Sequence, residues 1–168
     1  MSIADALVAE FDQEMQSTRR LLELVPADKA GWKPDPKSWN LGDLSVHVAN
    51  LPVWAVSTLQ QTELDMNPTD GPGYTPPSYD SPTATLASFD ENVKNARAAI
   101  AGASDQDMTV SWSLKNAGES IFTMPRAAVL RSFVFNHMIH HRGQLTVYLR
   151  MNDVPLPSTY GPTADSPM

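Results

Sequence analysis

The feature that most limits the fold of this chain is a set of helical apolar patterns bounded by prolines. Apolar residues recur at spacings of three and four, which is the period of an amphipathic helix. Four such patterns occur, in residues 3–25, 40–64, 82–100 and 125–152. Pro26 ends the first pattern and Pro125 opens the last, as expected for a residue that cannot continue a helix but fits its first turn. We therefore predict an all-α fold, a four-helix bundle.

The connection between the second and third helices limits how the helices run. Residues 65–80 are rich in proline and glycine, and we predict no regular structure there. About 15 extended residues span roughly 50 Å, whereas a 25-residue helix is about 37 Å long. The connection is long enough to return along the bundle, which predicts an up-down-down-up order. Residues 110–122 alternate apolar and polar side chains around a turn at 115–118, which indicates a small β-hairpin before the last helix.

The charge of the chain excludes two classes of partner. The net charge is −7, from 19 acidic and 12 basic residues, and no face gathers lysine and arginine. Binding to nucleic acid or to an anionic membrane surface needs such a cluster. We therefore expect neither partner. The chain has no cysteine, so any metal must be bound by nitrogen or oxygen ligands.

Length and apolar content predict the organisation and location of the protein. A chain of 168 residues is long enough to bury a core, and we predict one domain over residues 1–168. The first residues lack the basic start and apolar run of a secretory signal. No stretch has the roughly 18 apolar residues of a membrane span. A soluble cytoplasmic protein is expected.

The histidines are concentrated on two of the predicted helices. His137, His140 and His141 lie in the last helix and His47 in the second. A spacing of four residues places two side chains about 40° apart around a helix and about 6 Å apart along it, which allows His137 and His141 to bind one metal ion. Helical angles place His47 on an inward stripe. A single inward histidine is more often a hydrogen-bonded core residue, but three leave several polar atoms in need of partners. We hypothesise a divalent-metal site of His47, His137 and His141.

Three neighbours are candidates for contacts with these ligands or with substrate. Asp43, one turn before the histidine of the second helix, can orient that imidazole or satisfy the first amides of its own helix. Gln144, one turn after the last histidine, can reach the site or only pack. His140 lies about 80° from the inward direction and is expected at the rim of the site, facing substrate. Tryptophans 32, 39, 54 and 112 are expected to fill gaps in the core and loops.

The remaining faces of the last helix predict further contacts. Arg142 points away from the histidines, toward an acidic neighbour. Phe135 and Ile139 form a second apolar strip that a lone bundle would expose. We expect this strip to be covered by a second subunit, giving a homodimer, or by the proline-rich tail at residues 154–162.

The most specific pattern in the chain is the segment His137-Met138-Ile139-His140-His141-Arg142-Gly143-Gln144-Leu145 followed by Tyr148-Leu149-Arg150. It resembles the last-helix signature of the DinB family, also called DinB/YfiT-like metalloenzymes. Trp32 with residues 34–39, and residues 154–155 with 160–162, resemble other parts of the family pattern. The resemblance implies a four-helix bundle in which His47, His137 and His141 bind nickel or zinc at an open site. Some relatives are transferases that use bacillithiol or mycothiol as a cosubstrate.

Two functions are compatible with these observations. The chain has no recognisable nucleophile motif or phosphate loop, and three nitrogen ligands leave a position for water or substrate, as in catalytic zinc sites. The first prediction is therefore a metal-dependent enzyme, a thiol S-transferase or a hydrolase, acting on a small molecule. The alternative is a non-catalytic, metal-stabilised bundle that forms a dimer or binds a partner.

Overall fold

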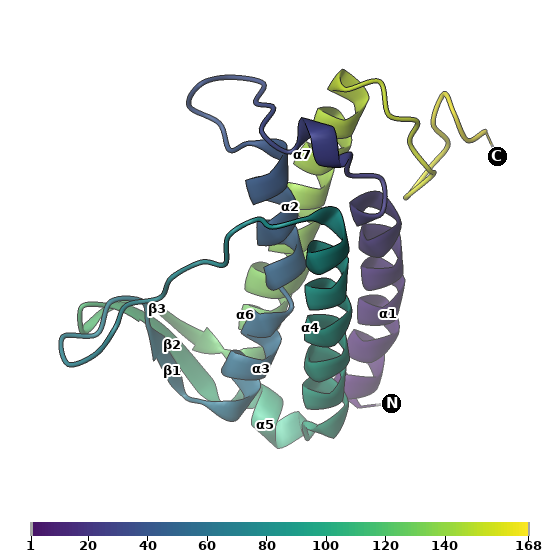
Figure 1. Cartoon of the computed structure of the whole chain (residues 1–168). Coiled ribbons are helices and arrows are strands. Elements are labelled where there is room, and N and C mark those ends of the chain that lie inside the picture. The colour runs from purple at the N-terminus through teal and green to yellow at the C-terminus, as the bar shows by residue number, and fades with distance from the viewer. Residues whose placement is uncertain (1, 168) are drawn as a thin grey trace.

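Helices make up most of the protein, and a small sheet lies at one side (Figure 1). The computed structural model describes residues 2–167. The longer helices are α1 (Ile3–Leu22), α2 (Leu41–Asn50), α3 (Val53–Gln60), α4 (Pro82–Gly102) and α7 (His137–Met151), the last preceded by α6 (Arg126–Val129) and a π-helical segment (Leu130–Asn136). The shorter elements are the 3-10 turn Ala27–Lys29, the helix α5 (Asp105–Thr109) and the strands β1 (Glu63–Asp65), β2 (Ser111–Asn116) and β3 (Glu119–Pro125).

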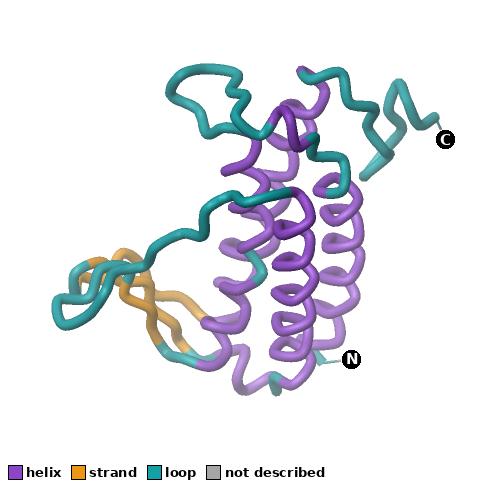
Figure 2. Tube along the Cα trace, in the orientation of Figure 1, coloured by secondary structure: helices purple, strands orange, loops and turns teal. Residues whose placement is uncertain are grey.

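The long helical segments lie side by side around a shared core (Figure 1). α1 and the α6–α7 segment run upward in the view of Figure 1, whereas α2–α3 and α4 run downward. Phe11 of α1, Leu44 of α2, Phe89 of α4 and Leu145 of α7 are all buried in this core. The 65–80 connection crosses beside the helices and contains no helix (Figure 2). Within residues 2–167, no helix is both long and apolar enough to cross a membrane.

Side-chain caps mark the starts of two long helices. Asn40 accepts a hydrogen bond from the backbone amide of Asp43, and Ser81 accepts one from the amide of Ala84. Each bond satisfies an amide that has no partner within the helix. Pro82 occupies the first helical turn, where its missing amide costs nothing.

The prediction that the second helix continues to residue 64 is wrong. α2 ends at Asn50, α3 begins at Val53, and the helix has ended by Gln61. Pro52 lies at the interruption, where it has no amide to donate to the helix. Residues 63–65 then form β1, which pairs in parallel with β2. A strand of three residues depends on its partner for every hydrogen bond, so helical periodicity could not predict it.

The predicted hairpin is present and is extended by β1. β2 and β3 pair in an antiparallel ladder that runs from Ser111 opposite Pro125 to Asn116 opposite Glu119. Ala117 and Gly118 form the turn, both with positive φ (51° and 82°), as a tight two-residue hairpin requires. The carboxylate of Asp65 accepts hydrogen bonds from both turn amides, at 3.0 and 2.7 Å. The sheet therefore forms one three-stranded unit in the order β1-β2-β3.

The predicted last helix, residues 125–152, is present but changes pitch. Its second part, Leu130–Asn136, is π-helical, and α-helical pitch resumes at His137. Angles calculated at 100° per residue therefore apply within α7 but not across this segment. The expectation of an exposed strip at Phe135 is wrong. Its side chain is fully buried and its ring meets the ring of Phe11 edge-on, with centroids 5.9 Å apart. α1 covers this position.

A buried ion pair connects α7 to α1 and to the C-terminal tail. Arg142 is 2% exposed, and its guanidinium lies 2.6 Å from the carboxylate of Glu14. The guanidinium also donates to the carbonyl oxygen of Glu14 and to the hydroxyl of Thr18. The hydroxyl of Tyr160, in the tail, donates to the Glu14 carboxylate and accepts from Arg142. The prediction that Arg142 points away from the histidines toward an acidic partner is confirmed.

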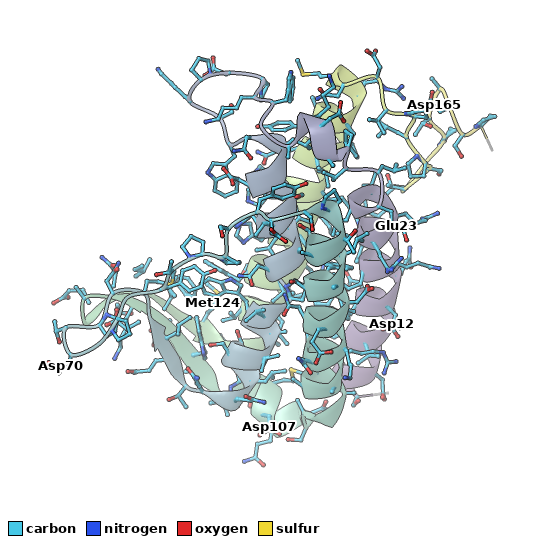
Figure 3. All side chains as sticks on the ribbon, in the orientation of Figure 1. Asp12, Glu23, Asp70, Asp107, Met124 and Asp165 are labelled. Carbon is cyan, nitrogen blue, oxygen red and sulfur yellow. The ribbon has the colours of Figure 1, made fainter. Side chains whose placement is uncertain are left out.

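Replacing Arg142 by methionine is expected to lower the free energy of unfolding by about 3 kcal/mol or more, because the Glu14 carboxylate would stay buried without its charge partner. Arg97→Met is the matched control. Arg97 pairs with Asp12 on the surface of α1 (Figure 3), and an exposed pair contributes about 1 kcal/mol or less. Urea unfolding at pH 7 measures both changes. Equal losses in the two variants would contradict a special role for the buried pair.

Candidate metal centre

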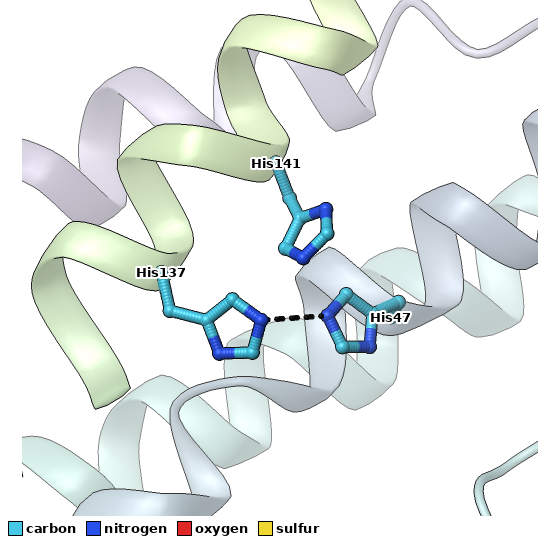
Figure 4. A group of neighbouring side chains, drawn as sticks. All are labelled: His47, His137 and His141. Carbon is cyan, nitrogen blue, oxygen red and sulfur yellow. Dashed lines mark hydrogen bonds between the residues drawn. The ribbon is translucent and has the colours of Figure 1, made fainter. Parts of the chain in front are cut away.

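Three histidines from two helices converge at the contact between α2 and α7 (Figure 4). His47 comes from α2, and His137 and His141 come from successive turns of α7. The Nε2 atoms of His47 and His137 lie 3.3 Å apart, and one nitrogen from each of the three rings lies within 4.8 Å of the others. All three side chains are half-buried. The helix contact that the metal hypothesis required is therefore present.

Burial keeps these imidazoles neutral. The pKa of His47 is lowered to about 4, first by loss of hydration and then by the neighbouring His141 and His137. Burial is also the largest cause that lowers the pKa of His137 and of His141. A neutral imidazole keeps a lone pair on one nitrogen, which is the form that binds a metal. At neutral pH, protons therefore compete weakly for these three nitrogens.

Gln144 orients the ring of His141. The side-chain oxygen of Gln144 lies 2.7 Å from Nδ1 of His141. An amide oxygen only accepts hydrogen bonds, so Nδ1 carries the proton and the lone pair is on Nε2. The amide nitrogen of Gln144 lies 3.2 Å from Nε2 of His140. Of the two roles considered for Gln144, contact with the site is therefore the one the structure shows.

The π-helical segment changes the backbone hydrogen bonds at His137. In an α-helix, the amide of His137 would donate to the carbonyl of Phe133, four residues earlier. Here that amide donates instead to the carbonyls of Ser132 and Val134. The backbone of Phe133 raises the pKa of the His137 imidazole, against the larger lowering by burial. Nε2 of this ring is directed toward His47.

One pair of donor atoms has the separation that a tetrahedral zinc site requires, and the third lies within 4.8 Å of both. Zinc binds imidazole nitrogen at about 2.0–2.1 Å in tetrahedral sites, which places two ligand nitrogens about 3.3–3.4 Å apart. The separation of 3.3 Å between the Nε2 atoms of His47 and His137 agrees with this value. The donor set is all nitrogen, which is compatible with zinc and nickel. The residues present therefore fit a metal ion.

The other predicted neighbours take peripheral positions. His140 is exposed, and its ring lies 4.8 Å from that of His141, which agrees with the predicted rim position. Asp43 is exposed, and its amide bonds to Asn40 at the start of α2. Within residues 2–167, its carboxylate has no hydrogen bond to His47. Asp43 does line a cavity beside that histidine.

Trp39 is a residue of the site that sequence reasoning missed. Its ring centroid lies 4.6 Å from that of His47, and the ring stacks on His141 at 5.6 Å. The prediction that Trp39 fills a gap in the core or loops is wrong. The side chain is 47% exposed and covers two of the histidines. The sequence signal for this position is that Trp39 directly precedes the helix cap Asn40. A capped helix start holds the residue before it close to the first turn of α2, which carries the site.

A cavity of about 240 Å³ opens beside His47. It lies between α2 and the end of the 65–80 connection. Its walls are Trp39, Asp43, Val46, His47, Asn50, Tyr74, Pro76 and Pro77. The hydroxyl of Tyr74 accepts a hydrogen bond from the side-chain amide of Asn50 at 2.8 Å, which ties the connection to α2. One histidine of the cluster, His47, therefore borders a small cavity.

Comparisons with known proteins identify the class to which this helical fold belongs. The sequence profile of the DinB family matches residues 1–167, so the chain belongs to the DinB family. The chain is similar to the uncharacterized protein YrdA of Bacillus subtilis (strain 168), with 24% identity over 165 residues, 96% of this chain and 90% of the relative. The resemblance found in the sequence is confirmed.

Two solved structures share the fold. A DinB-like protein from Bacillus cereus ATCC 10987 superposes with a TM-score of 0.71 at 22% identity, covering 93% of this chain and 97% of that one. The DinB-like protein YjoA from Bacillus subtilis superposes with a TM-score of 0.63 at 16% identity, covering 88% and 92% of the two chains. The arrangement of helices and sheet is therefore a DinB-like fold.

Removal of a ligand tests the metal centre directly. Protein purified without a histidine tag is expected to contain about one zinc or nickel ion per chain, and His137→Ala is expected to contain almost none, because two nitrogens hold an ion far less tightly than three. His140→Ala is the control, since that residue lies outside the cluster. Elemental analysis measures all three proteins. Equal metal content in the wild type and His137→Ala would contradict the prediction.

The low pKa of His47 predicts how stability depends on pH. The ordinary pKa is 6.5 and the folded value is about 4, so between these values the unfolded chain binds more protons than the folded chain. The free energy of unfolding of the metal-free protein should therefore be highest above pH 6.5 and fall as the pH is lowered toward 4. Urea unfolding at several pH values, with chelator present, measures the effect.

Two variants isolate the contribution of His47 from that of the carboxylates, which also titrate in this range. His47→Gln should lose less stability on acidification than the wild type, because it has no imidazole to protonate. His140→Gln, at the exposed rim, should follow the wild type. Parallel pH profiles for the wild type and His47→Gln would show that burial of this ring has no such effect.

Proposed function

We propose that this DinB-family protein is a metal-dependent enzyme in which His47, His137 and His141 hold a divalent ion, nickel or zinc. The proposed reaction is thiol S-transfer or hydrolysis of a small molecule. The observation that supports it most is the convergence of three neutral imidazoles at the edge of an open cavity. The chemistry that such an ion supplies is a lowered pKa for a thiol or a water molecule, which gives a nucleophile at neutral pH.

The residues of the chain have separate tasks in this proposal. The three histidines bind through nitrogens whose lone pairs are directed inward. Gln144 keeps the ring of His141 in the required tautomer. Trp39 covers the outer side of two rings and limits access by water. The cavity beside His47 admits the substrate, and exposed His140 faces it from the rim.

The number of ligands favours an enzyme over the non-catalytic alternative. Structural zinc sites are usually closed by four protein ligands, whereas catalytic sites keep a position for water or substrate. Within residues 2–167, the cluster consists of three histidines without a carboxylate. A cavity borders it. This arrangement leaves a coordination position free for a substrate or cosubstrate, which a purely stabilising ion would not need.

Several sequence predictions remain part of this proposal. We propose one domain with an up-down-down-up four-helix bundle, supported by the directions of the long helices in Figure 1. We propose bacillithiol or mycothiol as the cosubstrate and the cytoplasm as the location. We also propose a homodimer. Because α1 covers Phe135, the proposed contact is at the end of α7, where Val147 and Met151 are each more than half exposed.

Turnover tests the catalytic part of the proposal. The metal-loaded protein is expected to accelerate conjugation of a haloarene or a bimane electrophile with bacillithiol or mycothiol, and chelation should reduce the rate to that of the uncatalysed reaction. Re-addition of zinc or nickel should restore it. A chromogenic ester assayed without thiol distinguishes hydrolysis. Absence of both activities, together with a large fall in melting temperature on chelation, would instead support the non-catalytic bundle.

A further inference from the structure

Tyr74 lines the same cavity as His47, although the two residues are far apart in the sequence. The 65–80 connection crosses from the sheet to the start of α4 (Figure 1), and it places Tyr74 beside Asn50 of α2. All three residues line the cavity of about 240 Å³. Asn50 follows His47 by three residues on the helix, so their Cβ atoms are about 5–6 Å apart. The phenol is therefore within reach of a small molecule that is bound at His47.

The hydrogen bond between Tyr74 and Asn50 leaves the phenolic hydrogen unused. The amide nitrogen of Asn50 lies 2.8 Å from the hydroxyl oxygen of Tyr74, and an amide nitrogen can only donate. The hydroxyl is therefore the acceptor in this bond. Its own hydrogen has no acceptor among residues 2–167. Burial raises the pKa of the Tyr74 phenol, so the hydroxyl keeps this hydrogen at neutral pH.

Aromatic contacts hold the ring of Tyr74 in place. Its centroid lies 6.4 Å from that of Trp54, whose ring is in turn 5.7 Å from that of Phe133. Phe133 meets the ring of His137 edge-on at 6.0 Å. These contacts connect the phenol to a second histidine of the cluster. A side chain that is already held loses less freedom when a ligand binds, which favours binding.

The polar atoms of this wall are complementary to an alcohol. The phenolic hydrogen of Tyr74 is a donor, and the side-chain oxygen of Asn50, which has no hydrogen bond within the described part of the chain, is an acceptor close to it. An alcohol hydroxyl both accepts and donates, so it can bond to both atoms. An alkyl group in the same place would displace their water and bond to neither.

We infer that Tyr74, together with Asn50, recognises a hydroxyl group on the body of the ligand that the metal centre binds. The inference rests on the proposed function, because the metal centre holds the other end of that ligand. It leaves the proposed cosubstrates unchanged. It adds the chemical class of the group that is recognised, and it assigns a role in specificity to the 65–80 connection, which the sequence indicated only as a link between helices.

Two pairs of thiols test the inference by isothermal titration calorimetry. 2-Mercaptoethanol is compared with 1-propanethiol, and 4-mercapto-1-butanol with 1-pentanethiol, so that a methyl group replaces the hydroxyl at a shorter and a longer reach. Each thiol is titrated into zinc-loaded wild type and zinc-loaded Tyr74→Phe. Tyr79→Phe is the matched control, because Tyr79 belongs to the same connection but does not line the cavity at His47. The zinc content of every preparation is measured first.

The measured quantity is the ratio of the affinity for the hydroxyl thiol to that for its alkyl partner. For at least one pair, this ratio should be lower in Tyr74→Phe than in the wild type by about two- to tenfold, the effect of one neutral hydrogen bond. It should stay unchanged in Tyr79→Phe. The alkyl thiols are more hydrophobic, but that difference is the same for each protein, so a change in the ratio reports on the phenol hydroxyl.

A further variant separates the donated hydrogen bond from the tie between the connection and α2. In Asn50→Asp, the carboxylate accepts the phenolic hydrogen of Tyr74, which keeps the tie but uses the donor. The ratio should therefore fall in Asn50→Asp as it does in Tyr74→Phe. A ratio that falls in Tyr74→Phe but equals the wild-type value in Asn50→Asp would show that only the tie matters, and it would contradict the inference.

The possible failures are distinguishable. A wild type that retains no zinc refutes the metal centre and with it the proposed function. A wild type that retains zinc and binds the thiols, but has the same ratios as Tyr74→Phe, refutes only the recognition of a hydroxyl by Tyr74. Absence of binding of all four thiols to the zinc-loaded protein would also overturn the inference.

Discussion

The packing of α2 against α7 is the interaction on which the site depends. Leu44 and Val48 of α2 and Leu145 of α7 are buried in the common core, and their removal from water drives the two helices together. His47 lies on α2 and His141 on α7. The burial of the apolar residues of these two helices therefore brings the two imidazoles together. The imidazoles lose hydration there, which lowers their pKa values. Core packing thus produces the neutral nitrogens that the proposed chemistry needs.

Local patterns predicted the parts of the structure that depend on local physics. Helical period and prolines placed α1 and α4 well, and the spacing of His137 and His141 identified two rings of the cluster. The features that the sequence did not predict all depend on contacts between residues far apart in the chain. β1 forms because β2 is beside it, and Phe135 is buried because α1 covers it. Trp39 reaches the histidines through a loop whose course no periodicity describes.

Two different features lie next to the rings of α7. Gln144 fixes one ring from the regular turn that follows it. The π-helical segment changes the backbone at the other, because the amide of His137 donates to the carbonyls of Ser132 and Val134 and not to that of Phe133. Irregular helical turns of this kind are frequent at functional sites.

The buried pair between Arg142 and Glu14 sets the rotational position of α7. Apolar side chains allow a helix to turn somewhat about its axis, because one aliphatic contact replaces another at little cost. A guanidinium that pairs with one carboxylate, one carbonyl and two hydroxyls opposes such a turn. Arg142 follows His141 directly in the chain. Any rotation of α7 that moved the imidazole of His141 out of the cluster would also break the contacts of the guanidinium. The ion pair therefore holds His141 at its angle around the helix axis.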